Sequence, residues 1–264
     1  MSAYIADYPR YAWQLLNGFR VNHERIYADL RRRDLAAYLN PARPLQVLDL
    51  ANGRLRPQYT LLKAEGHNVY GIDLANRPET NWRNQTYRLA RWSYRRNLKL
   101  LSSIDDETLI CGDVGALPFP NEAFDLVTSI AAFEHLLAVP TVVAELQRVM
   151  RPGSLVWVSI HLFTSLSGGH NLSFTQIPTH TVPDWIDPWD HLRRRKLPFH
   201  VPLNEWRKNQ FLETFANHFE ILDHYCAIRE GEHLLTPALK AELSSYSRDE
   251  LTCRDFVIVA CKRS

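Results

Sequence analysis

The chain has few of the features that mark secreted, metal-stapled or membrane-spanning proteins. Its 264 residues include four cysteines, Cys111, Cys226, Cys253 and Cys261, with no Cys-x-x-Cys spacing. We therefore expect reduced, buried thiols rather than disulfides or zinc ligands. No apolar run approaches the roughly 18 to 20 residues that a membrane span requires, and the N-terminus has no apolar signal core. A cytoplasmic protein without a membrane partner is predicted.

The chain also lacks an excess of one charge. The formal net charge is +2, with 45% hydrophobic and 23% charged residues, which is ordinary for a globular protein. Composition therefore gives no general attraction to nucleic acid, and any electrostatic argument must be local. The length favours one large domain with insertions and leaves the oligomeric state undetermined.

Short apolar runs rich in β-branched residues recur along the chain and end in acidic or glycine-bearing turns. Such runs, without polar alternation, are typical of a parallel sheet covered on both faces. Six of them are expected to be strands: 47–50, 69–73, 109–113, 124–130, 151–160 and 255–260, with a further strand near 219–227.

Three turns in this pattern carry a resemblance to a known family. After the first run, Asp49 and Gly53 match an acidic-x-Gly-x-Gly-x-Gly turn, although Ala51 and Leu55 replace its outer glycines. Asp73 closes the second run, and Gly112-Asp113-Val114 closes the third. The segment 144–153 is similar to the helix, turn and fifth strand of the class I S-adenosylmethionine-dependent methyltransferases, which the chain resembles best over about 44–160.

The resemblance implies a doubly wound, seven-stranded, mostly parallel sheet, the Rossmann-like methyltransferase fold of the α/β class, with N-terminal helices and an inserted lid after strand five. It implies S-adenosylmethionine as cofactor and S-adenosylhomocysteine as product. Asp73 would accept bonds from the ribose hydroxyls, Asp113 would hold the adenine amino group, and the Val114 backbone would read the ring. The complete set of predicted cofactor contacts is Asp49, Ala51, Asn52, Gly53, Asp73, Leu74, Asp113, Val114 and Ile130. Each aspartate can also be only a turn former or helix cap.

Domain organisation follows from the spacing of the runs. We expect an N-terminal helical cap over 1–44 and the methyltransferase domain over 45–264, with insertions at about 74–107 and 161–203. The cap would bury an apolar face made of Leu15, Leu16, Phe19, Ile26, Leu30, Leu35 and Tyr38. A helix is expected from about 204 to 217, and 229–252 receives no assignment beyond some helix.

The two insertions are candidates for acceptor recognition. Arginines and aromatic residues interleave over 77–99, a pattern suited to an anionic acceptor, or alternatively to a solvated helix with buried aromatics. The proline-punctuated block 161–203 follows strand five, where a long excursion commonly serves as a lid or binding loop. We expect this block to define the substrate.

Histidines supply the candidate bases, because imidazole has its ordinary pKa near neutrality. His170 follows Gly168-Gly169, which we expect to be flexible, and His135 follows strand four. These two are the predicted catalytic residues, with His161 a weaker candidate and His191 a structural or substrate contact. Glu134-His135 resembles the Glu-x-x-Glu-His segment with which some quinone-pathway and RNA-end methyltransferases bind a divalent ion. Because Ala131 replaces the first glutamate, no metal is predicted.

The predicted function is therefore methyl transfer from S-adenosylmethionine to a small-molecule or glycan-type acceptor, at oxygen. One alternative is a protein that keeps the fold without methyl transfer, as a binding subunit or with another use of the cofactor pocket. A second alternative is an RNA methyltransferase, which would use the arginine-rich segment. Fold alone does not decide among these functions.

Overall fold

The computed structural model describes residues 19–39, 43–76, 82–100, 106–170, 187–199 and 201–263, with side chains omitted over 19–23 and 82–86. The chain divides into two compact units, Met1–Thr128 and Ser129–Ser264, and each is treated by itself below. Within the described ranges, no helix has the length and apolar character that a bilayer span requires.

Seven strands form one mixed sheet in the order β3-β2-β1-β4-β5-β7-β6. Their bounds are β1 Gln46–Leu50, β2 Asn68–Ile72, β3 Leu109–Ile110, β4 Phe124–Ile130, β5 Met150–His161, β6 Glu220–Arg229 and β7 Cys253–Cys261. β1 pairs in parallel with β2 and β4, and β2 pairs in parallel with β3. β7 runs antiparallel to both β5 and β6. The predicted fold class is confirmed, including the reversed final strand.

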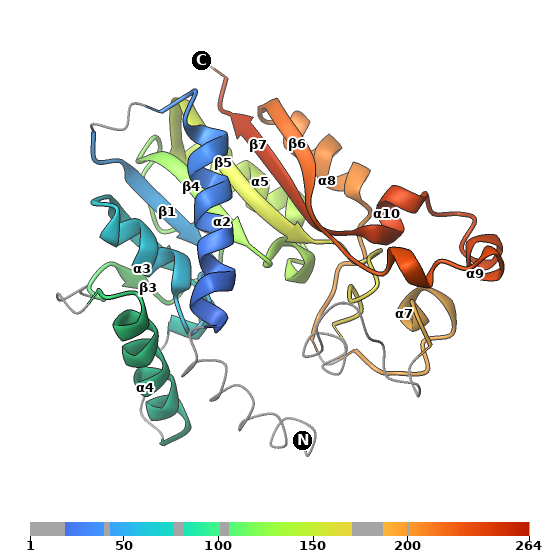
Figure 1. The fold of residues 1–264 in the computed structure, drawn as a ribbon. Coiled ribbons are helices and arrows are strands. Elements are labelled where there is room, and N and C mark those ends of the chain that lie inside the picture. The colour runs from blue at the N-terminus through green and yellow to red at the C-terminus, as the bar shows by residue number, and fades with distance from the viewer. Residues whose placement is uncertain are drawn as a thin grey trace. The chain divides into compact units, whose positions relative to one another are not determined.

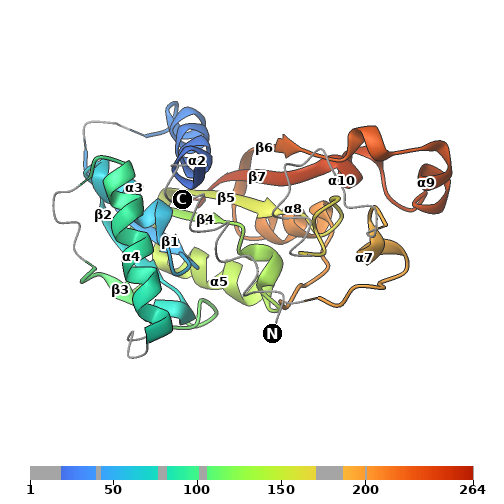
Figure 2. The ribbon, with the colours of Figure 1, turned by 60° about the horizontal axis from the view of Figure 1, so that its bottom comes forward.

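The first unit packs helices α2 (Phe19–Leu35), α3 (Pro57–Ala64) and α4 (Trp82–Asn97) against one another (Figures 1 and 2). One side chain from each helix, Ala28, Leu61 and Tyr94, meets in a buried cluster with Leu98. The short η1 helix, Leu74–Asn76, follows β2 directly. The helices thus fix the ends of β1 and β2, where the predicted cofactor residues lie.

The buried face of α2 differs from the predicted one. Leu35 is buried as expected, but Ile26 and Tyr38 are 47% and 51% exposed, whereas Arg31 is only 2% exposed. Arg31 Nη1 donates to Gln58 Oε1 at 2.6 Å, and its Nη2 donates to Glu65 Oε2 at 3.3 Å. The helix is therefore rotated so that a paired guanidinium, rather than Ile26, faces α3. Leu15 and Leu16 lie outside the described residues.

The second unit contains α5 (Val139–Val149) and α8 (Lys208–Ala216), which pack together, and α8 also contacts β6 and β7. α8 begins at Lys208, later than the expected helix start at about 204. The preceding segment is instead irregular, with Glu205 at φ 59°, and is anchored by Asn204, whose Nδ2 donates to the carbonyls of Phe133 and Leu136 at 2.7 and 2.9 Å. These bonds satisfy the carbonyls beside the short η2 helix, Phe133–His135.

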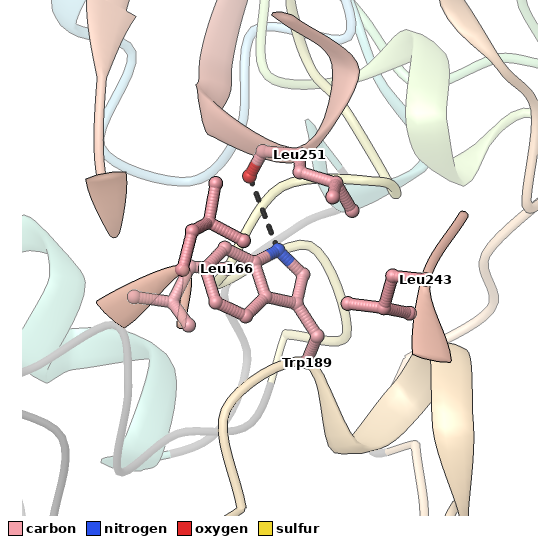
Figure 3. Packing of buried hydrophobic residues seen from close by; sticks show 5 residues of the cluster. Leu166, Trp189, Leu243 and Leu251 are labelled. Atoms are coloured by element: carbon pink, nitrogen blue, oxygen red, sulfur yellow. Dashed lines mark hydrogen bonds between the residues drawn. The ribbon is translucent and has the colours of Figure 1, made fainter. Parts of the chain in front are cut away.

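A small apolar core forms around Trp189, just before α7 (Asp190–Arg193) (Figure 3). Its indole Nε1 donates to the Leu251 carbonyl at 3.1 Å, and Leu166 and Leu243 pack against the ring. The segment that sequence left unassigned supplies η3 (Glu232–Leu234), α9 (Pro237–Glu242) and α10 (Arg248–Thr252). The described ends of the 161–203 insertion are thus built into a hydrophobic core.

Candidate functional site

The turn after β1 uses left-handed backbone at three positions. Ala51, Gly53 and Arg56 have φ values of 53°, 63° and 54°. Glycine adopts this conformation without steric cost, whereas alanine and arginine do so under strain. Arg56 is also the N-cap residue of α3. The chain therefore makes the tight turn that the degraded motif predicts, with its last left-handed residue at Arg56 instead of at Leu55.

Asp73 joins this turn to the one after β2. Its Oδ2 accepts the Gly53 N–H at 2.8 Å, and its Oδ1 accepts the Ala75 N–H at 2.6 Å. The carboxylate is only partly buried. A carboxylate offers about four lone-pair sites, so two remain for outside donors such as paired hydroxyl groups. The next residue, Leu74, is 70% exposed.

Two asparagines beside Asp73 carry buried polar atoms that the protein leaves unsatisfied. Asn76 Nδ2 donates to Asn52 Oδ1 at 2.9 Å and to the Ile110 carbonyl at 3.1 Å. Asn52 Nδ2 and Asn76 Oδ1 are buried, and no described residue offers either atom a hydrogen bond. A bound molecule with its own donors and acceptors would satisfy both atoms. Asn52 was predicted as a contact; Asn76 was not, although its place in a turn after Asp73 could have indicated it.

Asp49 lies beneath the turn and is 2% exposed. Burial raises the pKa of its carboxyl to about 7, and the positive charge of Arg31 acts in the opposite direction. Its Oδ2 has no hydrogen-bond partner among the described residues. Arg31 thus acts on the charge of Asp49, a role that the sequence did not reveal because Arg31 lies in the run Arg31-Arg32-Arg33.

Asp113 and Val114 lie in the loop after β3. Asp113 is exposed, and its Oδ1 accepts the Gly115 N–H at 2.8 Å, the geometry of a local turn. Val114 is buried. The turn-forming alternative is thus realised at Asp113, and one carboxylate oxygen is still able to accept a further bond. Ile130, the last predicted contact, ends β4 and is partly buried.

In the second unit, a buried carboxylate lies among histidines; we name Glu134, His135, His161 and His170 the Glu134 cluster. Glu134 is 1% exposed, and within the part of the chain that the structure describes neither carboxylate oxygen has a hydrogen-bond partner. Its Oε1 lies 3.8 Å from His135 Nε2 and 3.9 Å from His170 Nε2. Burial raises the pKa of the Glu134 carboxyl to about 8, and the backbone N–H of the same residue lowers it in part.

The two predicted catalytic histidines therefore lie together, with their rings 4.7 Å apart. His135 Nδ1 is 2.9 Å from the Pro202 carbonyl, which only accepts, so Nδ1 carries the hydrogen and Nε2 has the lone pair. Burial lowers the pKa of His135, and it lowers that of His170 to about 3, with the nearby His135 acting in the same direction. Both imidazoles are therefore neutral at physiological pH, and their lone pairs can accept a hydrogen bond or bind a metal ion.

His161 and His191 are held by the protein itself. The Ser167 hydroxyl donates to Glu230 Oε1 at 2.7 Å, so His161 Nε2–H must donate to Ser167 Oγ at 2.8 Å. His191 Nε2 donates to the Phe163 carbonyl at 2.8 Å. His191 thus takes the structural role that was one of its two predicted alternatives. The buried Ser167–Glu230 pair was missed, and no spacing in the sequence signals it.

The glycines before His170 serve close packing. A Cβ on Gly168 would lie 2.2 Å from the Phe163 carbonyl oxygen, and one on Gly169 would lie 2.7 Å from His191 Cβ. The expectation that these glycines give flexibility is therefore wrong, because the buried loop leaves no space for a side chain. His170 itself has φ 48°, a strained conformation of the kind concentrated at functional sites.

Much of the arginine-rich segment is engaged within the first unit. Arg91 is buried and donates to the Arg54 carbonyl at 3.0 Å, and Arg95 donates to Asp106 at 2.7 Å. Arg96 remains exposed and lies over the Trp92 ring. The solvated helix with a buried aromatic is thus the better description. Several residues of the two insertions fall outside the described side chains: Arg77, Glu79, Trp82, Arg83, Asn171, His180 and Asp184.

Comparison with known proteins agrees with this geometry. Residues 48–158 match the family model of a methyltransferase domain. A sterol 24-C-methyltransferase of Pneumocystis carinii is 31% identical over 121 residues, 44% of this chain and 29% of that protein. A malonyl-[acyl-carrier protein] O-methyltransferase of Halorhodospira halophila is 35% identical over 124 residues, 45% of this chain and 36% of that protein. The chain thus spans less than two fifths of these relatives.

The fold is also similar to that of a methyltransferase of known structure. The crystal structure of an S-adenosylmethionine-dependent methyltransferase from Mesorhizobium loti matches with a TM-score of 0.51 and 16% identity, covering 87% of this chain and 96% of that one. Residues 48–158 therefore match a methyltransferase domain, and the fold is the Rossmann-like fold of this S-adenosylmethionine-dependent methyltransferase. The cofactor of this class is S-adenosylmethionine, and the acidic, partly open turn around Asp73 fits it.

Proposed function

We propose that this protein transfers a methyl group from S-adenosylmethionine to an oxygen of a small-molecule acceptor. The observation that carries the proposal is Asp73, which ties the turns after β1 and β2 together and still has acceptor sites for ribose hydroxyls. Asn52 and Asn76 would complete the polar surroundings, with Asp49, Ala51, Gly53, Leu74, Asp113, Val114 and Ile130 as further contacts.

The small-molecule acceptor is supported by the two relatives, one named for a sterol and the other for malonyl-[acyl-carrier protein]. Methylation at oxygen is supported by the neutral imidazoles of His170 and His135. In the transfer, the acceptor oxygen forms a bond to the methyl carbon while the carbon–sulfur bond breaks and its electron pair stays on sulfur. The hydroxyl proton must also leave, and we keep His170 and His135 as its proposed acceptors; a base contributes on the order of 10² to 10⁴ in rate where one is used. We include glycan-type acceptors in this proposal, and we propose that 161–203 bounds the acceptor.

A protein that has the fold without methyl transfer is the second candidate. Its support is the altered motif, in which Ala51 and Arg56 take strained left-handed conformations. An RNA acceptor has less support, because Arg91 and Arg95 are committed to contacts within the chain. A protein without methyl transfer need not bind the cofactor. An RNA methyltransferase would bind both the cofactor and polyanions.

Calorimetric titration with S-adenosylhomocysteine tests the first step, with Asp73→Ala as the variant and Asp29→Ala as a matched control. Asp29 is an exposed aspartate of α2, so its loss should leave binding unchanged. Incubation with methyl-labelled S-adenosylmethionine and a panel of hydroxylated lipids, acids and sugars then tests transfer, read by mass spectrometry of product. If well-folded protein binds neither cofactor form, the methyltransferase proposal is wrong.

A further inference from the structure

We propose that Glu134, His135 and His170 form a binding site for a divalent transition-metal ion with the preferences of zinc. One carboxylate oxygen and one nitrogen from each imidazole lie within 4.8 Å of one another. This proposal departs from the sequence prediction of no metal, which rested on Ala131 at the first glutamate position. The structure supplies the missing ligand differently, because the loop after β5 brings His170 to Glu134.

Three atoms in this group are buried and have no hydrogen-bond partner among the described residues: Glu134 Oε1, Glu134 Oε2 and His170 Nε2. A buried carboxylate without a partner is costly, and proteins rarely leave several such atoms together. A cation placed between Glu134 and the two imidazoles would satisfy the carboxylate and both nitrogen lone pairs at once. Glu134, His135 and His170 therefore have the arrangement expected of three ligands to one metal ion.

The donor orientations fit this interpretation. The Pro202 carbonyl holds the His135 Nδ1–H, so Nε2 presents its lone pair toward Glu134. Such a hydrogen bond on the far ring nitrogen is the usual way that a metal-binding histidine is oriented. The Glu134–His135 and Glu134–His170 separations of 3.8 and 3.9 Å compare with about 3.4 Å between ligands of a tetrahedral zinc site. These two separations would need to shorten by about half an ångström, and all three ligand atoms already lie within 4.8 Å of one another.

The chemistry of the donors selects the class of metal. Calcium and magnesium prefer shells made almost wholly of oxygen ligands, which a single carboxylate cannot supply. Two imidazoles and one carboxylate are typical of zinc and of ferrous iron, and three protein ligands leave a coordination position open for water or another oxygen ligand. His161, the remaining histidine of the Glu134 cluster, already donates through Nε2 to Ser167.

The test is calorimetric titration of the chelator-treated, desalted full chain with zinc chloride, cobalt chloride and magnesium chloride. We expect one zinc or cobalt ion per chain and no comparable binding of magnesium. Cobalt should also give the visible absorption of a low-coordinate nitrogen and oxygen site. Absence of zinc and cobalt binding, or equal binding of magnesium, would overturn the proposal.

Variants locate the ion. Glu134→Gln and His170→Ala should each weaken zinc binding by at least about 100-fold, since each removes a direct ligand. His233→Ala, which changes an exposed histidine of η3, should leave it unchanged. If Glu134→Gln does not fold, as judged by circular dichroism, His135→Ala takes its place. Undiminished stoichiometric binding by the ligand variants would place the ion elsewhere and overturn the assignment. The cofactor titration is independent, so the cofactor site and the metal site can fail separately. With the ion bound, His135 and His170 would serve as its ligands and not as acceptors of the hydroxyl proton.

Discussion

Asp73 Oδ2 accepts the Gly53 N–H at 2.8 Å, while the other carboxylate oxygen accepts from Ala75 at 2.6 Å. One side chain therefore sets the conformation of both turns at the predicted cofactor site. The two bonds use both oxygens, so an amide cannot replace the carboxylate without turning its NH₂ group toward a backbone donor.

Asp73→Asn should weaken S-adenosylhomocysteine binding by roughly 10-fold to 100-fold, since hydrogen bonds to a charged group contribute about 1.5 to 3 kcal/mol. The measurement is titration calorimetry at one salt concentration. A variant with unchanged affinity would show that Asp73 acts only in folding. The control is Asp29→Asn, whose side chain is exposed on α2 and pairs only locally with Arg32.

Asp49→Asn should change how stability depends on pH. The folded-state pKa of Asp49 is raised from 3.8 to about 7, so the native state keeps a proton that the unfolded chain releases near pH 4. The contribution of Asp49 to stability is greatest below pH 4, falls between about pH 4 and 7, and is constant above. The groups that act on it are Arg31, Glu24 and Asp73, and Arg31 has the largest effect among them.

Because one pKa unit corresponds to about 1.36 kcal/mol, the variant should gain up to roughly 4 kcal/mol relative to wild type between pH 4 and 7.5. Urea denaturation across that range measures this difference. Parallel stability curves for the two proteins would contradict the burial argument.

Arg31→Met should destabilise the first unit by about 3 kcal/mol, because it leaves the Gln58 amide without its buried partner and removes the cation facing Glu65. Methionine retains most of the apolar stem, so the loss reports mainly on the charge and its bonds. Arg32→Met is the matched neighbour: its side chain is 60% exposed and should contribute less than about 1 kcal/mol. Equal losses in urea denaturation would refute the pairing.

Gly168→Ala should destabilise the second unit strongly, since the new methyl would lie 2.2 Å from a backbone oxygen that cannot move aside. We expect a loss of about 3 kcal/mol or more in thermal or urea unfolding. Gly112→Ala is the comparison, because the nearest atom to its added Cβ would be the flexible end of Ile72 at 3.1 Å, and the next contacts are side-chain atoms at 3.6 Å or more. A harmless Gly168→Ala would show that the loop is as flexible as the sequence suggested.

The sequence predicted the sheet well because each strand is a continuous apolar run whose burial depends on local pattern. It also nominated Asp73, His135 and His170, since acidic turns and histidines after strands keep the same place relative to the sheet. It missed Arg31 and the Ser167–Glu230 pair, whose burial depends on contacts between distant segments. The rotation of α2 likewise follows from the long-range pairing of Arg31 with Gln58, which outweighs the exposure of Ile26.

The indole of Trp189 donates to the Leu251 carbonyl and fills the space between Leu166 and Leu243. The segments 161–203 and 229–252 therefore share one hydrophobic core, and a change in one affects the packing of the other. A chimera that imports 161–203 from a relative, in order to change acceptor preference, would also have to import 229–252, because each half supplies the walls of the other.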